Sequence, residues 1–179
     1  MASEKIPDRT GASRELLLTA LPFTVVTGGI WWRMGMPLVS LALPLAGYAL
    51  LAWLVVAGVP GQQGIGPANR VTFYRALGVV ILAGILLEPQ LLAVAQWAWV
   101  MLALAVLILD GLDGYLARRF SVSTYFGARF DMEVDAALIL TLSLAVWGLG
   151  ITGPWVMLLG LMRYLFVAAG WIWPWVNCP

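Results

Sequence analysis

The sequence predicts an all-α protein that crosses a membrane about six times. Three observations favour this class: 62% of the 179 residues are hydrophobic and only 11% are charged, the mean hydropathy is strongly positive, and the apolar residues form long runs. Soluble domains carry about 25% charged residues, so this is the composition of a polytopic membrane protein. The net charge of +1 leaves no basic stripe for phosphates, which argues against a nucleic-acid partner.

Six apolar stretches approach the length of about 20 residues that a helix needs to cross the hydrocarbon core. They are Leu16 to Trp32, Pro37 to Val59, Ala68 to Leu87, Leu91 to Leu116, Gly127 to Leu149 and Pro154 to Trp175. We therefore divide the chain into a charged leader (residues 1–15), two N-terminal membrane helices (residues 16–59) and a membrane core (residues 67–176). The leader either lies along the inner headgroups or extends into solvent.

Lysines and arginines indicate the orientation, because they accumulate in cytoplasmic loops. With the N-terminus inside, the outer loops hold only Arg33. The inner segments hold Lys5, Arg9, Arg14, Arg70, Arg118, Arg119 and Arg129. We therefore expect both termini on the cytoplasmic side. Tryptophans at the ends of the stretches, Trp31, Trp32 and Trp99 among them, fit an interfacial belt.

Acidic residues concentrate where the fourth stretch ends and the fifth begins. At 100° per residue, Asp110 and Asp113 share one helix face, and Asp131 and Asp135 are one turn apart on the next helix. Charged groups inside a membrane helix are costly and normally face a cavity or a partner. We expect the four carboxylates to converge between the two helices, near the cytoplasmic surface.

Four close carboxylates need a counter-charge, because like charges disfavour each other's ionised form. Two hard divalent cations about 4 Å apart would supply it, and a chain without histidine favours Mg²⁺ or Mn²⁺. Gly114 and Gly127 allow a close backbone approach to a ligand, and Arg118 suits a phosphate. The pattern predicts a dinuclear metal site for a phosphorylated ligand. The alternative is a structural cluster neutralised by Arg118, Arg119 and Arg129.

This stretch resembles the signature of the CDP-alcohol phosphotransferases, D-x2-D-G-x2-A-R-x8-G-x3-D-x3-D. Every fixed position is met, by Asp110, Asp113, Gly114, Ala117, Arg118, Gly127, Asp131 and Asp135. Upstream, PANRVTFYR is similar to the family's first-helix motif, with Asn69, Thr72 and Arg75 in the matching places.

The resemblance implies a reaction of phospholipid biosynthesis, in which the hydroxyl of an acceptor alcohol displaces CMP from a CDP-linked alcohol, usually CDP-diacylglycerol. By that similarity Asp110, Asp113 and Asp131 hold two Mg²⁺ or Mn²⁺ ions. Asp135 completes the metal site or acts as general base, so that Asp131 and Asp135 are the catalytic candidates. The implied CDP pocket consists of Asn69, Thr72, Gly114, Ala117, Arg118 and Gly127.

The resemblance also implies a homodimer. We expect the protein in a bacterial inner (plasma) membrane, with the active site facing the cytoplasm, where the Lys and Arg residues accumulate. Gly78 and Gly84 are small enough to allow close packing between the membrane helices of two copies.

The acceptor side of the site keeps alternatives open. The segment ARFDMEVDAA does not resemble the versions associated with glycerol phosphate, serine or inositol phosphate acceptors. Arg129 contacts either an anionic acceptor or lipid phosphates. Arg163, inside the last apolar stretch where an unpaired charge is costly, contacts an acceptor phosphate or pairs with an aspartate or Glu88. Glu133 points to a different helix face from its neighbouring aspartates.

Two other functions would also use buried carboxylates: a divalent-cation transport pathway, and a catalytically silent membrane partner. The resemblance further implies three helices after the third core helix, where one follows here. The two N-terminal helices either replace the last pair, as in a circular permutation, or are an addition to a truncated core.

Overall fold

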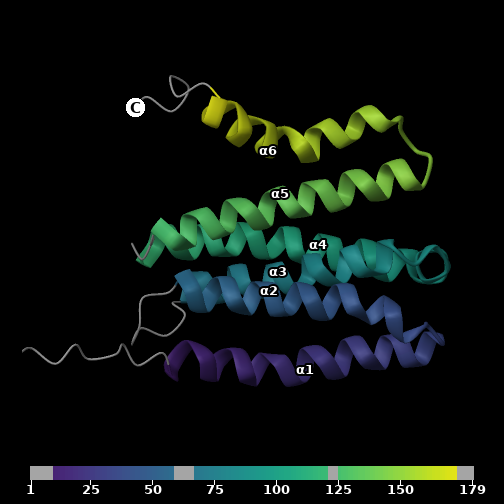
Figure 1. Cartoon of the computed structure of the whole chain (residues 1–179), viewed down its shortest axis with the longest axis horizontal. Helices are drawn as coiled ribbons and strands as arrows, with labels where there is room; N and C mark the ends of the chain where they lie inside the picture. The colour runs from purple at the N-terminus through teal and green to yellow at the C-terminus, as the bar shows by residue number, and fades with distance from the viewer. Residues whose placement is uncertain (1–9, 59–66, 121–124, 173–179) are drawn as a thin grey trace, which may run out of the picture. The chain divides into compact units, whose positions relative to one another are not determined.

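The protein is all-α in the computed structural model, which describes residues 10–58, 67–120 and 125–172. Figure 1 shows the helices in chain order. The described residues form six α-helices: α1 (Thr10–Met34), α2 (Ala42–Gly58), α3 (Pro67–Leu86), α4 (Pro89–Phe120), α5 (Tyr125–Gly148) and α6 (Met157–Ile172). Two short 3-10 helices, η1 (Leu38–Leu41) and η2 (Pro154–Val156), precede α2 and α6.

The all-α prediction is confirmed, and each predicted apolar stretch overlaps one of these helices. Three helical stretches are long and apolar enough to cross a membrane, namely Arg14–Met34, Asn69–Leu86 and Leu91–Gly111. The apolar helices Ala42–Gly58 and Pro154–Ala169 are shorter, and α5 carries four charged residues in its first half. Among the described residues, three of the six predicted spans therefore have the length and hydropathy of a membrane-spanning helix. The inside placement of both termini stays a prediction.

Local sequence signals set several helix ends. Pro67 and Pro89 are the first residues of α3 and α4, where proline's missing N–H costs nothing and its fixed φ suits the helix. Gly35 and Gly150 follow α1 and α5 with positive φ angles of 65° and 69°. This left-handed conformation closes a helix, and glycine adopts it without strain. These signals explain why the observed ends lie within a few residues of the predicted ones.

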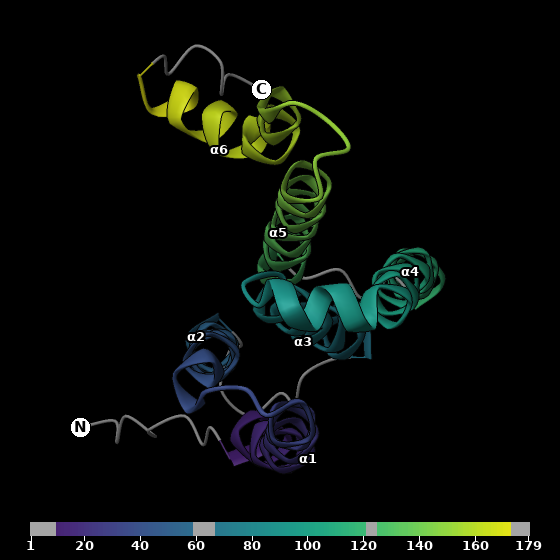
Figure 2. The same cartoon turned by 90° about the vertical axis from the view of Figure 1, so that its right-hand side faces the viewer.

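The chain divides within α5 into two compact units, Met1–Asp131 and Met132–Pro179, and each is described by itself. In the first unit α3 packs most extensively against α4 and also contacts α2, which in turn contacts α1. Figure 2 shows α3 lying between α2 and α4. Much of the buried core comes from α3, including Phe73, Leu77 and Leu82. This helix is therefore the one around which the first unit is built.

Two tryptophans of the first unit lie in the core. Trp31 is 1% exposed and donates its indole N–H to Ser40 Oγ at 2.6 Å. Trp99 is 7% exposed and donates to the Leu82 carbonyl at 3.1 Å. These two side chains fill space between helices and find indole partners inside the protein, and their interfacial position stays a prediction. Trp32, by contrast, is strongly exposed, as a belt requires.

Gly78 and Gly84, expected to allow packing between copies, bring helices of the same chain together. A Cβ at Gly78 would lie 2.5 Å from Val106 Cγ2 of α4, and one at Gly84 would lie 3.4 Å from the Trp31 ring. Both positions therefore serve the close approach of α3 to its neighbours within the first unit. The homodimer stays a prediction.

In the second unit, α6 approaches α5 most closely at Gly160. A Cβ at that position would lie 2.5 Å from the Cα of Leu140. A backbone atom cannot rotate out of the way as a side chain can, so the absence of a side chain at Gly160 is what allows the two helices to meet.

We predict that Gly78→Ala lowers the free energy of unfolding by about 1–3 kcal/mol, because the added methyl overlaps Val106 and forces α3 away from α4. Thermal unfolding in detergent measures the loss. Gly28→Ala is the matched control, since a Cβ there meets nothing within 4 Å. When Gly78→Ala is combined with Val106→Ala, the cost should be smaller than the sum of the two single costs; strict additivity would contradict the overlap.

Candidate active site

The acidic cluster is built around a buried arginine of α3. Arg75 Nη2 donates to Asp110 Oδ1 at 2.7 Å, and Arg75 Nη1 donates to Asp131 Oδ1 at 2.6 Å. The arginine side chain is 0% exposed, whereas the two carboxylates are 44% and 38% exposed. Arg75 therefore joins α3 to α4 and to the first part of α5, with its charge held between two acids.

The packing of α3 against α4 places these charges. Three contacts run in opposite chain directions along the two helices, which are therefore antiparallel. They are Leu82 with Trp99, Gly78 with Val106, and Arg75 with Asp110. Residues four apart share a helix face, so Asp110 continues the face of α4 that Val106 buries against α3. The ion pair thus continues the row of contacts that Leu82 and Gly78 make with α4.

Asp135 lies one turn beyond Asp131 on α5, so the helix itself places both aspartates on one face. One carboxylate oxygen from each of Asp110, Asp131 and Asp135 lies within 4.8 Å of the other two. Three clustered carboxylate oxygens suit a hard cation such as Mg²⁺ or Mn²⁺. The site therefore fits the predicted kind of metal. Asp113, the expected fourth ligand, lies in the last two turns of α4, where the described structure is limited to the backbone.

The predicted CDP-binding residues come from three helices. On α3, Thr72 is buried one turn before Arg75, and Asn69 is partly exposed near the start of the helix. Gly127 is buried in the first turn of α5. The other three lie on α4 beyond the described side chains: Gly114, Ala117 and Arg118. Their joint role in binding CDP stays a prediction.

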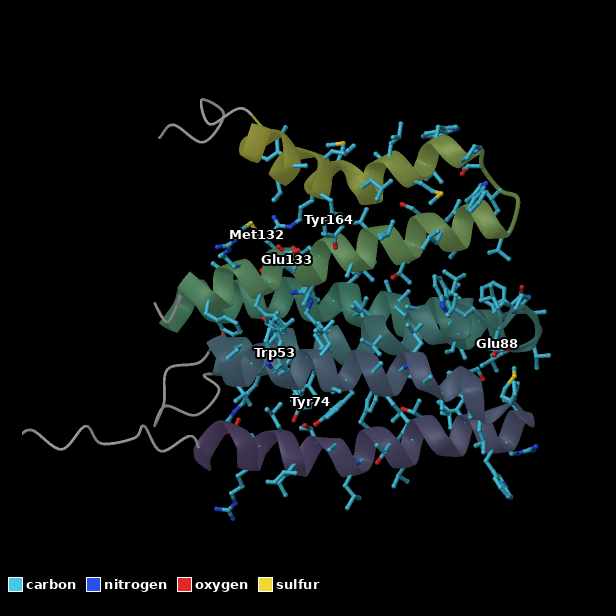
Figure 3. The ribbon with its side chains drawn as sticks, viewed as in Figure 1. Trp53, Tyr74, Glu88, Met132, Glu133 and Tyr164 are labelled. Atoms are coloured by element: carbon cyan, nitrogen blue, oxygen red, sulfur yellow. The ribbon has the colours of Figure 1, made fainter. Side chains whose placement is uncertain are left out.

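The two arginines expected on the acceptor side have different surroundings. Arg129 is exposed on α5. Arg163 of α6 donates through Nη2 to Glu133 Oε1 at 2.5 Å, and its Nη1 lies 3.6 Å from the Met132 sulfur. Figure 3 shows Met132 and Glu133 on the side of α5 that faces α6. Both acceptor roles stay predictions.

Arg163 forms its salt bridge with Glu133, a carboxylate that the prediction of an aspartate or Glu88 did not include. The physical reason is helix geometry. Glu133 occupies a different face of α5 from the aspartates on either side of it, and α6 packs against the Glu133 face. Glu133, which the sequence places outside the site, therefore binds the charge of α6.

Arg75 is the residue of the cluster that the sequence patterns do not single out. The first-helix motif contains it, but the acidic pattern predicts neutralisation by metal ions or by Arg118, Arg119 and Arg129. A usable signal does exist in the sequence. Arg75 falls inside the candidate span Asn69–Leu86, and a charge within a membrane helix needs a partner.

Comparison with known families identifies the class of the protein. A family model described as CDP-alcohol phosphatidyltransferase matches residues 65–177, which include α3 to α6 and every member of the cluster. This chain belongs to the CDP-alcohol phosphatidyltransferase family and is a transferase of substituted phosphate groups. The resemblance stated from the sequence is thereby confirmed. No curated protein and no solved structure matches the chain.

We predict that Glu133→Gln lowers the free energy of unfolding by about 1 kcal/mol, because the pair with Arg163 is partly exposed, at 50% and 25%. Thermal unfolding in detergent measures the change. A charge swap, Glu133→Arg with Arg163→Glu, should recover stability relative to Arg163→Glu alone. Failure of the swap to recover any stability would contradict the pairing of these two side chains.

Proposed function

We propose that this chain transfers a phosphatidyl group from CDP-diacylglycerol to the hydroxyl of an alcohol acceptor and releases CMP, in phospholipid biosynthesis. The observation that carries the proposal is the cluster of Asp110, Asp131 and Asp135, whose oxygens lie within 4.8 Å of one another, in a chain of the CDP-alcohol phosphatidyltransferase family. The cluster matches the chemistry, because attack on a pyrophosphate requires negative charge to be neutralised around the reacting phosphorus.

In the proposed reaction the acceptor oxygen attacks the phosphorus that carries the diacylglycerol. A new P–O bond forms to the acceptor, the P–O bond to CMP breaks, and the acceptor proton passes to a carboxylate. A bound pair of Mg²⁺ or Mn²⁺ ions would neutralise the pyrophosphate and stabilise the departing CMP. Asp110, Asp113 and Asp131 would hold these ions. Asp135 would complete their coordination or take the acceptor proton, a role that requires hydrogen-bond reach.

The remaining predicted residues complete the site in this proposal. Asn69 and Thr72 of α3 would contact the CDP moiety together with Gly114, Ala117, Arg118 and Gly127. The antiparallel packing of α3 and α4 supports this arrangement. Thr72 and Asn69 lie one and two turns before Arg75 on α3, and this direction along α3 leads toward the C-terminal end of α4, which carries the signature residues. Arg129 and Arg163 would contact the acceptor.

The place of the site in the membrane follows from the same proposal. A site at the cytoplasmic end of the helices would let a water-soluble nucleotide and lipid tails meet, and the Lys and Arg distribution supports an inside position for this end. We further propose that the active form is a homodimer in a bacterial inner membrane.

We predict that Asp131→Asn reduces CMP release from CDP-diacylglycerol by about 100-fold or more, because the site loses a ligand charge and a hydrogen-bond acceptor. The assay is a CMP-release screen of purified protein across candidate acceptor alcohols. Glu15→Gln, whose carboxylate pairs with Arg70 and is not part of the aspartate cluster, is the matched control and should keep activity within about threefold of wild type. Unchanged CMP release by Asp131→Asn would overturn the metal assignment.

We predict that EDTA abolishes CMP release and that Mn²⁺ or Mg²⁺ restores it. The clustered ligands, Asp110, Asp131 and Asp135, are carboxylates, whose oxygen atoms suit these ions. Activity with increasing free metal, measured at constant ionic strength, checks this prediction. Uptake of Mn²⁺ into proteoliposomes without nucleotide, together with an absence of CMP release for every acceptor, would instead support a transport function.

A further inference from the structure

Arg75 lies between two carboxylates of the aspartate cluster, Asp110 and Asp131, and supplies a positive charge to both. We propose that Arg75 is a positioning residue, which holds the Asp110 and Asp131 carboxylates together in the metal-free protein, and that a divalent cation takes over part of this charge balance on binding. The inference rests on the metal-dependent function proposed above.

The burial of Arg75 is the first argument. Its side chain is 0% exposed, and a guanidinium stays protonated in proteins. A desolvated charge is tolerated only when partners of good geometry satisfy it. Arg75 meets this condition with donor-to-oxygen distances of 2.6 Å and 2.7 Å to carboxylates on two different helices. Loss of these contacts would leave a charge stranded in an apolar interface, so the contacts constrain where both acids lie.

The carboxylates give the second argument. Asp110 and Asp131 come from different helices and repel each other when both are ionised. With no positive charge between them, α4 and the start of α5 would tend to separate at this point. The planar fork of Arg75 opposes this, because its two terminal nitrogens contact one oxygen of each acid. The ligands for a cation are thereby gathered before the cation arrives.

Competition between the two positive charges has a measurable consequence. If Arg75 and a cation balance the same carboxylates, removal of the arginine should make the protein more dependent on the cation for its stability. An arginine with a merely structural contact would instead cost the same stability with and without metal. The difference between two unfolding midpoints, one in EDTA and one in Mn²⁺, therefore separates the two roles.

The test is Arg75→Met, which keeps the length of the side chain and removes its charge. Unfolding of the full chain in detergent is followed by temperature, once in EDTA and once in saturating MnCl₂. We expect the midpoint in EDTA to fall by about 10 °C, since removal of the arginine leaves two carboxylates close together that repel each other. In MnCl₂ we expect more than half of this loss to be recovered, so that Mn²⁺ raises the midpoint more in the variant than in wild type.

Arg70→Met is the matched control on the same helix. Arg70 also pairs with a carboxylate, through its Nε and Glu15 Oε2 at 3.0 Å, but its side chain is 54% exposed and its partner is not part of the aspartate cluster. Its midpoint change should be small and equal in EDTA and MnCl₂. Arg75→Lys keeps the charge without the fork, and should fall between wild type and Arg75→Met in EDTA.

Equal losses for Arg75→Met in EDTA and MnCl₂, or no loss in EDTA, would overturn the positioning role while leaving the proposed enzyme function intact. A Mn²⁺ effect absent from wild type and variant alike would overturn the metal site, and the positioning role with it. If Arg75→Met can be purified only with Mn²⁺ present, the proposal is supported. If it cannot be purified at all, Arg75→Lys decides by the same comparison: an excess Mn²⁺ effect supports the proposal and equal effects overturn it.

Discussion

The ion pairs of Arg75 are the interaction on which the site depends. A charge buried between helices must be satisfied or it destabilises the fold, and here the two acids that pair with it are both members of the aspartate cluster. The same contacts therefore serve folding and function. They tie the central helix α3 to α4 and to the start of α5, and they fix the positions of two carboxylates that would otherwise repel each other.

An apolar scaffold makes this arrangement effective. Small and apolar groups of α3 and α4 meet beside the site, such as Gly78 against Val106, so the two helices approach closely there. The charged groups continue this row of contacts, and Asp110 and Asp131 keep 44% and 38% of their side-chain surface exposed. A phosphorylated substrate can reach acids of this exposure, whereas Arg75 behind them is fully enclosed. Family membership explains why acids that suit a cation are clustered here, since a transferase acting on CDP-alcohols must neutralise the charge of a pyrophosphate.

Charge pairing elsewhere in the chain follows the same physical rule with a different outcome. Arg163 of α6 pairs with Glu133 of α5, and the pair joins two helices of the second unit. Residues two apart on a helix point in nearly opposite directions, so Glu133 contacts α6 while Asp131 on another face of α5 contacts Arg75.

Neighbouring tryptophans also differ in their surroundings. Trp32 is exposed as an interfacial residue would be, while its neighbour Trp31 is buried against Ser40.

The sequence by itself determined the helical class, the approximate ends of most helices, the family and the clustered acids Asp110, Asp131 and Asp135, since these depend on composition, on periodicity and on a signature of fixed spacing. It also placed Asp131 and Asp135 on one face, because a single helix fixes that relation. Only the tertiary structure decided which charge lies between Asp110 and Asp131, which carboxylate receives Arg163, and whether Gly78 and Trp31 face lipid, another copy or the same chain. Each of these is a contact between helices, and a contact between helices depends on how the helices rotate and pack against one another, which local sequence patterns do not encode.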